Sequence, residues 1–419
     1  MSDVETKTPA ARVATDLQDE RLTQGTGFRG SLAALGNRIR GGDIGVLPVV
    51  AGLIVIALVF NTLNPIFLSS ANISNLLLES VPVGVIALGI VCVLLVAEID
   101  LSVGSVSGLA AALLAVLWVD RGLPVGVTIA LCLLAGVAIG VLYSQLFNRL
   151  GVPSFVITLA GLLAFVGVQL WLLGAKGAVN LPFDSPLVQF TQIQYVPGWL
   201  SYVFVVLAAA GLFASGYMHA RARRNAGLSA QSMTVLAVRS LVLLVLLGLL
   251  VAFLNQTRGV GWMFVFFVAL VVVMHYVLTR TKFGRSMFAV GGNPEAARRA
   301  GINVKRVYMS VFVLCSTFAV LGGILAAARL AAANQASGGA DVNLNAIAAA
   351  VIGGTSLFGG RGSAFAALLG ILVIQAISNG LTLLSLDSSY RFMITGGVLL
   401  LAVSLDSVAR RSRVSHGRA

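Results

Sequence analysis

The chain has 419 residues, of which 58% are hydrophobic and 10% charged, and its formal net charge is +13. Its mean hydropathy of +0.97 excludes a soluble domain, in which about a quarter of the residues are charged. In a membrane protein a positive balance reflects topology, because Lys and Arg accumulate in cytoplasmic loops, so we expect no nucleic-acid partner.

The first 44 residues are polar, mixed in charge and poor in aromatic side chains. This composition predicts a cytoplasmic leader that is partly disordered. Within it, apolar residues recur at helical spacing in FRGSLAALGNRIR (28–40), which predicts a short interfacial helix. The leader lacks the pattern of a cleavable signal peptide.

Apolar runs fill the sequence from 45 to 406, which we expect to form the transmembrane domain. A helix needs about 20 apolar residues to cross the hydrocarbon core, and the alternation typical of a barrel is weak. We therefore predict an all-α, polytopic membrane protein with about 10–12 transmembrane helices, including broken or short ones. The runs are 46–63, 81–97, 103–119, 125–147, 155–173, 203–217, 235–254, 263–278, 307–330, 346–358, 364–384 and 392–405.

Basic residues predict the orientation of these runs. With the N-terminus inside, the inward segments hold 23 of the 28 Lys and Arg, and the outward loops hold 4. We therefore expect a multi-pass protein of a prokaryotic plasma membrane, with both termini and a basic tail (407–419) in the cytoplasm. The segment of about 191–260 adds two spans around a basic loop, so it is a possible insertion.

Two polar interruptions break the apolar sequence, AEIDLSVGS (97–105) and VIGGTSLFGGRGS (351–363). Broken or short helices at comparable places in two halves of a transporter point to its translocation pathway. Alternatively, Asp100 or Ser102 caps the helix that starts near Val103, with Glu98 at the interface; the two roles are compatible. The candidates for the pathway are Glu98, Asp100, Ser102, Ser154, Thr158, Thr355, Ser356 and Asn379.

A basic loop, 280–306, contains seven Lys or Arg. Gly291, Gly292 and Asn293 predict a turn in which Asn293 caps a helix, and the following Pro294 is typical of a first helical position. Glu295 to Ala300 continue this helix and Gly301 ends it. A helix this short and polar is not stable alone, so it needs a protein partner.

The loop resembles the EAA-x3-G loop of the permeases of ATP-binding-cassette (ABC) importers, through Glu295-Ala-Ala and Gly301. The interruptions together with AVGGNPEAARRAGINVKR and VPSFVITLAG (152–161) are similar to the pentose/hexose permease family, over about 45–408. The two additional spans are most similar to its xylose-type branch. The I-x-L-P ending of maltose-type loops is absent, and Arg361 places an unusual charge in a glycine loop. The resemblance implies that these residues contact an ATPase: Gly291, Gly292, Asn293, Glu295, Ala296, Ala297, Arg298, Arg299 and Gly301.

The resemblance implies a permease subunit that moves a monosaccharide, such as the pentose xylose, into the cell. No lysine lies in a phosphate-binding G-x-x-x-x-G-K-[ST] loop, so we expect no catalytic residue and no cofactor on this chain. ATP and Mg would act on a separate cytoplasmic ABC ATPase. An extracytoplasmic sugar-binding protein and a second permease copy complete the expected partners.

A different class of function remains open at this point. In a proton- or cation-coupled secondary transporter, Glu98 and Asp100 would form the relay. A membrane enzyme has no support, because no catalytic constellation is visible. The three cysteines and three histidines show no metal-ligand spacing, so no metal site is expected.

Overall fold

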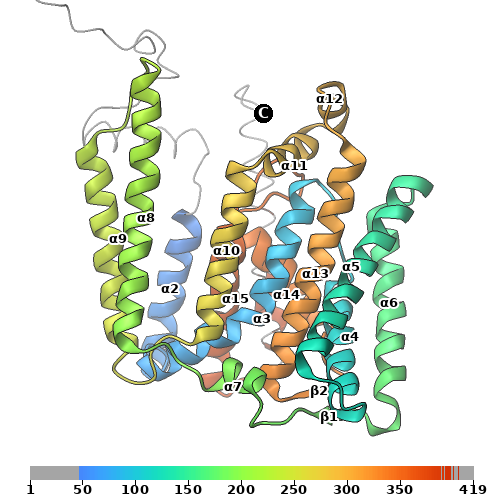
Figure 1. Cartoon of the computed structure of the whole chain (residues 1–419). Coiled ribbons are helices and arrows are strands. Elements are labelled where there is room, and N and C mark those ends of the chain that lie inside the picture. The colour runs from blue at the N-terminus through green and yellow to red at the C-terminus, as the bar shows by residue number, and fades with distance from the viewer. Residues whose placement is uncertain (1–46, 388, 391, 398–399, 401–403, 405–419) are drawn as a thin grey trace, which may run out of the picture. The chain divides into compact units, whose positions relative to one another are not determined.

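The structure is a computed structural model, and it describes residues 47–387, 389–390, 392–397, 400 and 404 (Figure 1). The predicted leader helix and the basic tail lie outside these residues. By internal contacts the chain divides into two compact units, which are described separately. Of the described residues, the smaller unit contains Pro197–Phe253, and the larger one contains the remaining residues before and after this segment.

The described chain is almost wholly helical, as predicted. The helices of the larger unit are α2 (Leu47–Leu63), α3 (Ser70–Leu95), α4 (Val103–Ala115) with a π-helical end η2 (Val116–Asp120), α5 (Val125–Leu150), α6 (Ser154–Leu173), η3 (Gly174–Lys176), α7 (Pro186–Gln192), α10 (Trp262–Arg280), α11 (Lys282–Gly292), α12 (Pro294–Arg299), α13 (Val304–Leu330), α14 (Ala340–Ile352) and α15 (Ala364–Leu383).

Helix α3 lies at the centre of the larger unit and is buried along most of its length, where it packs on α13, α14 and α15. Glycines allow the close approach. A Cβ on Gly89 would meet the backbone of Cys315 at 3.0 Å, and one on Gly140 would meet that of Val313 at 2.4 Å. Small residues at helix contacts are typical of membrane bundles, in which packing drives association.

The smaller unit is a helical hairpin of α8 (Gly198–Asn225) and α9 (Met233–Leu254), the last residue of which belongs to the larger unit. A Cβ on Gly216 of α8 would meet the side chain of Leu236 on α9 at 2.3 Å, so the two helices are in contact. The turn between them contains Gly227 at a φ of +71°. That this segment is an insertion stays a prediction.

Nine described helices are long and apolar enough to cross a membrane, and α14 and the part of α2 from Pro48 are shorter. The apolar run of 346–358 does not match its helix. Helix α14 starts earlier, at Ala340, and ends at Ile352, because Gly353 and Gly354 follow in a turn. At 13 residues it is only about 20 Å long, too short to span the hydrocarbon core.

A small antiparallel sheet was not predicted. Strands β1 (Ala178–Asn180) and β2 (Ala332–Asn334) pair Val179 with Ala333. The sheet joins the segment that follows η3 to the segment that follows α13. Such short strands give no periodicity that sequence reasoning could detect.

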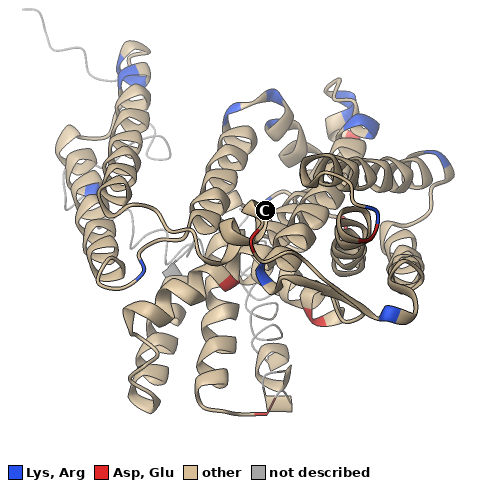
Figure 2. Ribbon diagram, turned by 60° about the horizontal axis from the view of Figure 1, so that its bottom comes forward, with Lys and Arg blue, Asp and Glu red and all other residues tan. Residues whose placement is uncertain are grey.

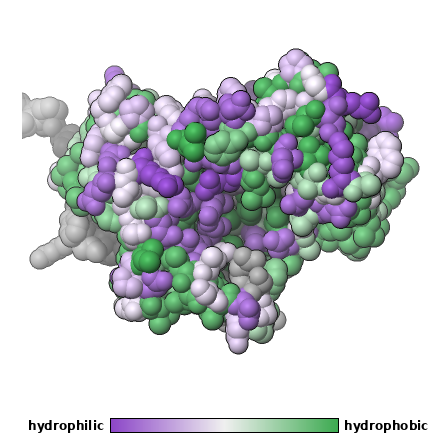
Figure 3. Space-filling view, turned by 90° about the horizontal axis from the view of Figure 1, so that it is seen from below, coloured by the Kyte–Doolittle hydropathy of each residue, from purple (hydrophilic) through white to green (hydrophobic). Residues whose placement is uncertain are grey.

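The connections of the larger unit lie at two ends. At the α12 end, hydrogen bonds join neighbouring connections. For example, Asn148 Nδ2 donates to the carbonyl of Lys305 at 3.1 Å. The β1–β2 end joins the other connections, for example through the 2.8 Å ion pair of Lys176 and Asp120. Figure 2 shows Lys and Arg residues mostly at helix ends. Figure 3 views the face opposite α12, where hydrophilic residues gather.

Basic residues are unequally divided between these ends. Among the described residues of the larger unit, nine lie at the α12 end and four at the β1–β2 end. The nine are Arg149, Arg280, Lys282, Arg285, Arg298, Arg299, Lys305, Arg306 and Arg361; the four are Arg121, Lys176, Arg258 and Arg329.

Candidate functional site

The basic loop folds into two short helices rather than one. Helix α11 begins after Thr281, whose hydroxyl accepts a hydrogen bond from the Gly284 amide at 3.1 Å. On its inner face Met287 and Val290 are buried against the other helices of the larger unit, while Lys282 and Arg285 are exposed. The sequence analysis missed α11, although Phe283, Met287 and Val290 follow the spacing of an amphipathic helix.

Helix α12 has both of the predicted caps. The Oδ1 atom of Asn293 accepts a hydrogen bond from the amide of Ala296 at 3.0 Å, and Pro294 takes the first helical position. At the other end Gly301 has a φ of +82°, and the amide of Ile302 donates to the carbonyl of Ala297 at 3.0 Å. This is the Schellman pattern. The predicted turn at Gly291 and Gly292 is wrong, because both residues end α11.

The outer surface of α12 is formed by exposed residues, of which Glu295 and Arg298 form an ion pair. The side chain of Ala297 alone is buried, and it anchors the helix to the core of the larger unit. The helix therefore presents a small, charged surface that protrudes at the α12 end (Figure 1). Contact of these residues with an ATPase stays a prediction.

Gly291 brings α11 against both polar interruptions. A Cβ at this position would lie 1.7 Å from the carbonyl oxygen of Leu95, the last residue of α3, and 2.7 Å from the amide nitrogen of Gly360. The same Gly360 amide donates to the Leu95 carbonyl at 2.9 Å. Next to it, a Cβ on Gly359 would meet Ala97 at 2.7 Å. We call these contacts of Leu95, Ala97, Gly291, Gly359 and Gly360 the glycine junction.

The first interruption is a buried turn between α3 and α4. Asp100 is 1% exposed, and its Oδ1 accepts hydrogen bonds from the amide and the hydroxyl of Ser102, at 2.8 and 2.7 Å. Tyr143 of α5 donates its hydroxyl to Ser102 Oγ at 2.8 Å. Ser102 is the N-cap residue of α4, as one of the two alternatives predicted, but its side chain makes no cap hydrogen bond and its hydroxyl donates to Asp100 instead.

Neighbouring helices hold the rest of this turn. Thr158 Oγ1 accepts from the Leu101 amide at 3.1 Å, and Ser154 Oγ accepts from the Ile99 amide at 3.5 Å. Asn343 of α14 donates to the Leu101 carbonyl at 2.6 Å. The structure thus brings together five of the candidates: Glu98, Asp100, Ser102, Ser154 and Thr158. Most of their hydrogen bonds are made to one another or to the backbone of this turn.

Burial governs the charge of the two carboxyls in this turn. It raises the pKa of Asp100, against the hydrogen bonds from Ser102, and it raises the pKa of the half-buried Glu98, against a hydrogen bond from Ser154. The second oxygen of Asp100, Oδ2, is buried and has no hydrogen-bond partner among the described residues by distance and angle, although the thiol of Cys315 lies close by. The burial and the bonds to Ser102 favour a structural role for the Asp100 carboxyl.

The other pathway candidates lie apart. Thr355 is buried beside Leu95 and Gly362, and Ser356 Oγ accepts from the amide of Phe358 at 3.2 Å, so both belong to the loop that follows α14. Asn379 lies toward the opposite end, on α15, where it exchanges two amide hydrogen bonds with Asn72. A pathway role for all eight residues stays a prediction.

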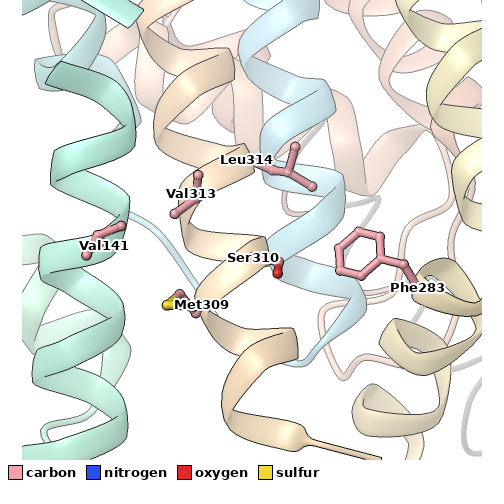
Figure 4. A pocket seen from close by; sticks show the side chains of 6 residues that line it. All are labelled: Val141, Phe283, Met309, Ser310, Val313 and Leu314. Carbon is pink, nitrogen blue, oxygen red and sulfur yellow. The ribbon is translucent and has the colours of Figure 1, made fainter. Parts of the chain in front are cut away.

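A groove between α5, α11 and α13 does not fit a sugar. Its volume is about 480 Å³, and it is lined by Val141, Phe283, Met309, Ser310, Val313 and Leu314 (Figure 4). Ser310 is the only polar residue in this lining, and its hydroxyl already donates to the Arg306 carbonyl. A sugar site needs several convergent polar groups, so this groove is not the site.

Comparisons with known proteins identify relatives along most of the chain. Residues 72–403 match the family described as "Branched-chain amino acid transport system / permease component". The chain is 36% identical over 374 residues to the Xylose transport system permease protein XylH of Escherichia coli K12, which covers 88% of the chain and 93% of the relative.

Two further relatives show similar coverage. The XylH protein of Haemophilus influenzae is 34% identical over 345 residues, 81% of the chain and 90% of the relative. The Ribose import permease protein RbsC of E. coli K12 is 32% identical over 360 residues, 86% of the chain and 92% of the relative. No solved structure matches.

Proposed function

The chain belongs to the family of ABC sugar permeases, and from this premise we propose that it carries a pentose, xylose in the first place, across the plasma membrane. It is a multi-pass transport subunit of this membrane. The identity of the sugar rests on the two xylose permeases among its relatives. The ribose permease, at lower identity, makes ribose the second candidate.

The observation that carries the proposal of ATP-driven import is α12. It is capped at both ends, anchored through Ala297 and charged on its outer surface. All of its residues except Ala297 are exposed, so the helix presents a rigid charged surface, and such a surface favours a docking partner. We propose that a separate ABC ATPase, which uses ATP and Mg, binds this surface, and that the chain itself binds neither.

The remaining partners follow from the same proposal. An extracytoplasmic sugar-binding protein would deliver the pentose at the β1–β2 end, and a second permease copy would complete the passage. The excess of basic residues at the α12 end supports a cytoplasmic position for that end and for both termini. Secondary transport through Glu98 and Asp100 is not favoured, because Asp100 is buried and bonded within its own turn.

The test is uptake of radiolabelled xylose into membrane vesicles that contain the chain, its ATPase and its binding protein. ATP and a proton gradient are supplied independently. We expect uptake with ATP alone and none with the gradient alone, and xylose in preference to ribose. Uptake driven by the gradient without the ATPase would refute ATP-driven import, and a preference for ribose would refute the choice of pentose.

A further inference from the structure

A polar surface crosses α3 and α15 within the membrane-spanning part of the larger unit. Glu79 of α3 is exposed, and Gln375 of α15 donates its amide to Glu79 Oε2 at 2.8 Å. Asn75 lies one turn from Glu79, and Asn379 one turn from Gln375, both half-buried. We call Asn75, Glu79, Gln375 and Asn379 the polar stripe.

The depth of this stripe is unusual for charged and amide groups. Helix α15 has 20 residues, about the length needed to cross the hydrocarbon core, and Gln375 lies eight residues before its end, roughly 12 Å inside. Among the described spans of the larger unit, α3 alone carries an Asp, Glu, Lys or Arg more than two turns from either end, namely Glu79.

Such groups do not face lipid. A carboxylate in hydrocarbon costs several kcal/mol, so ionisable residues inside membrane spans face water or other protein. The surfaces expected to meet lipid are different in kind: on α6, for example, the exposed side chains include Leu159 and Leu163. The exposed part of the stripe therefore faces water or another protein rather than lipid.

The donors and acceptors of the stripe suit a neutral sugar. The exposed carboxylate of Glu79 keeps acceptor sites beyond its bond to Gln375, and the Gln375 and Asn379 amides offer both donors and acceptors. Arg258, whose Nη1 is 3.5 Å from Asn75 Oδ1, adds the opposite charge at the edge. Hydroxyl groups donate to carboxylates and accept from amides, so a polyhydroxylated, uncharged ligand matches this set.

We propose that Glu79 and Gln375 line the sugar passage and contact the hydroxyl groups of the transported monosaccharide. The inference deepens the proposed import function and rests on it for the identity of the ligand. It moves the contact residues away from the turn of Asp100, where the polar groups are bonded to one another.

Thiol reactivity tests whether the stripe borders water. Glu79→Cys and Gln375→Cys are compared with Leu163→Cys, a site on α6 that is 68% exposed but expected to meet lipid. The three natural cysteines are buried. We expect a charged methanethiosulfonate reagent to modify the first two variants on the order of tenfold faster, because the thiolate forms in water. Equal, slow modification at all three sites would overturn the proposal.

Uptake of labelled xylose tests the contact itself. Glu79→Leu and Gln375→Leu should each lower ATP-driven uptake on the order of tenfold, since each removes the polar atoms that bond a sugar hydroxyl, whereas Glu79→Gln keeps the shape and an acceptor oxygen and retains most uptake. Ser80→Ala is the matched control, because Ser80 is buried and bonds only to Leu77 of its own helix.

The outcomes separate this inference from the proposed function. If the unmodified chain takes up no xylose with ATP, the proposed function fails, and thiol reactivity still decides whether the stripe borders water. If unmodified chain and Ser80→Ala transport normally and both leucine variants do so as well, the contact proposal is wrong. Rapid disulfide formation between two copies of Glu79→Cys would also contradict it, since the stripe would then be a subunit interface.

Discussion

At the scale of single residues, buried polar groups stabilise the turn between α3 and α4. Asp100 satisfies two donors of Ser102, and Thr158, Ser154 and Asn343 satisfy backbone groups nearby. A network of this kind destabilises the fold when one partner is removed, because a buried donor without an acceptor costs about 1–3 kcal/mol. The turn therefore depends on its acceptors more than on a charge.

The first prediction concerns Asp100. Asp100→Asn keeps Oδ1 as an acceptor for Ser102, so we expect the variant to fold and to retain ATP-dependent uptake. Asp100→Ala leaves the Ser102 amide and hydroxyl without this acceptor and should destabilise the protein by about 1–3 kcal/mol. Thermal unfolding of the purified protein and vesicle uptake measure the two effects. Loss of proton-driven uptake in Asp100→Asn with Glu98→Gln would instead support a proton relay.

The second prediction concerns Gly301, the left-handed residue that ends α12 at a φ of +82°. Gly301→Ala should strain this end by about 1–2 kcal/mol and lower uptake by disturbing the docking surface. The control is Gly122→Ala, which has a similar φ of +67° at the opposite end and no atom within 4 Å of the new Cβ. Equal uptake by the two variants would mean that the shape of α12 is not needed for coupling.

At the scale of elements, the glycine junction joins α11 to the ends of both interrupted segments. Because α12 follows α11 directly, a displacement of α12 by a bound partner would reach α3 and the loop after α14 through Gly291. The contact is made by backbone atoms, so no side chain can relax to absorb an added Cβ.

The third prediction compares two neighbouring glycines of α11. Gly291→Ala forces the helix end away from Leu95 by more than about 1 Å, since a Cβ at 1.7 Å from an oxygen must move to an ordinary contact distance. Gly292→Ala meets no atom within 4 Å. We expect both variants to bind the ATPase, but only Gly291→Ala to lose xylose transport per ATP hydrolysed, on the order of tenfold.

A second pair of glycine variants separates a coupling defect from a folding defect. Gly359 and Gly354 both have positive φ, at +80° and +101°, so alanine strains either one. Only Gly359 faces the junction, whereas Gly354 has open space around it. If Gly359→Ala and Gly354→Ala couple equally, and Gly291→Ala couples like Gly292→Ala, the junction plays no part in coupling.

The sequence predicted the positions of the helices better than it predicted the contacts between them. Apolar runs located the spans, and Asn293, Pro294 and Gly301 located α12, because caps depend on local chemistry. The start of α3 at Ser70 was missed, since its first turns carry Asn72, Asn75 and Glu79 and are stabilised by packing. For the same reason Gln375 was not a candidate: its relation to Glu79 spans 296 positions and exists only in the fold.

At the scale of the whole molecule, the uneven division of basic residues predicts which end faces the cytoplasm. The native cysteines are buried, so single new cysteines report orientation. Gln335 is exposed beside β2, and Arg299 is exposed at the end of α12, so the two positions mark opposite ends of the larger unit. The variants to compare are therefore Gln335→Cys and Arg299→Cys.

In intact cells, a membrane-impermeant maleimide should label Gln335→Cys and leave Arg299→Cys unlabelled until the membrane is opened by detergent. The physical reason is that translocating Lys and Arg is costly, so the end with nine basic residues stays inside and the end with four is translocated. Labelling after permeabilisation controls for reactivity at each position. The reverse pattern would place α12 outside the cell, where no ATP-hydrolysing subunit could bind it, and would remove the basis of ATP-driven import.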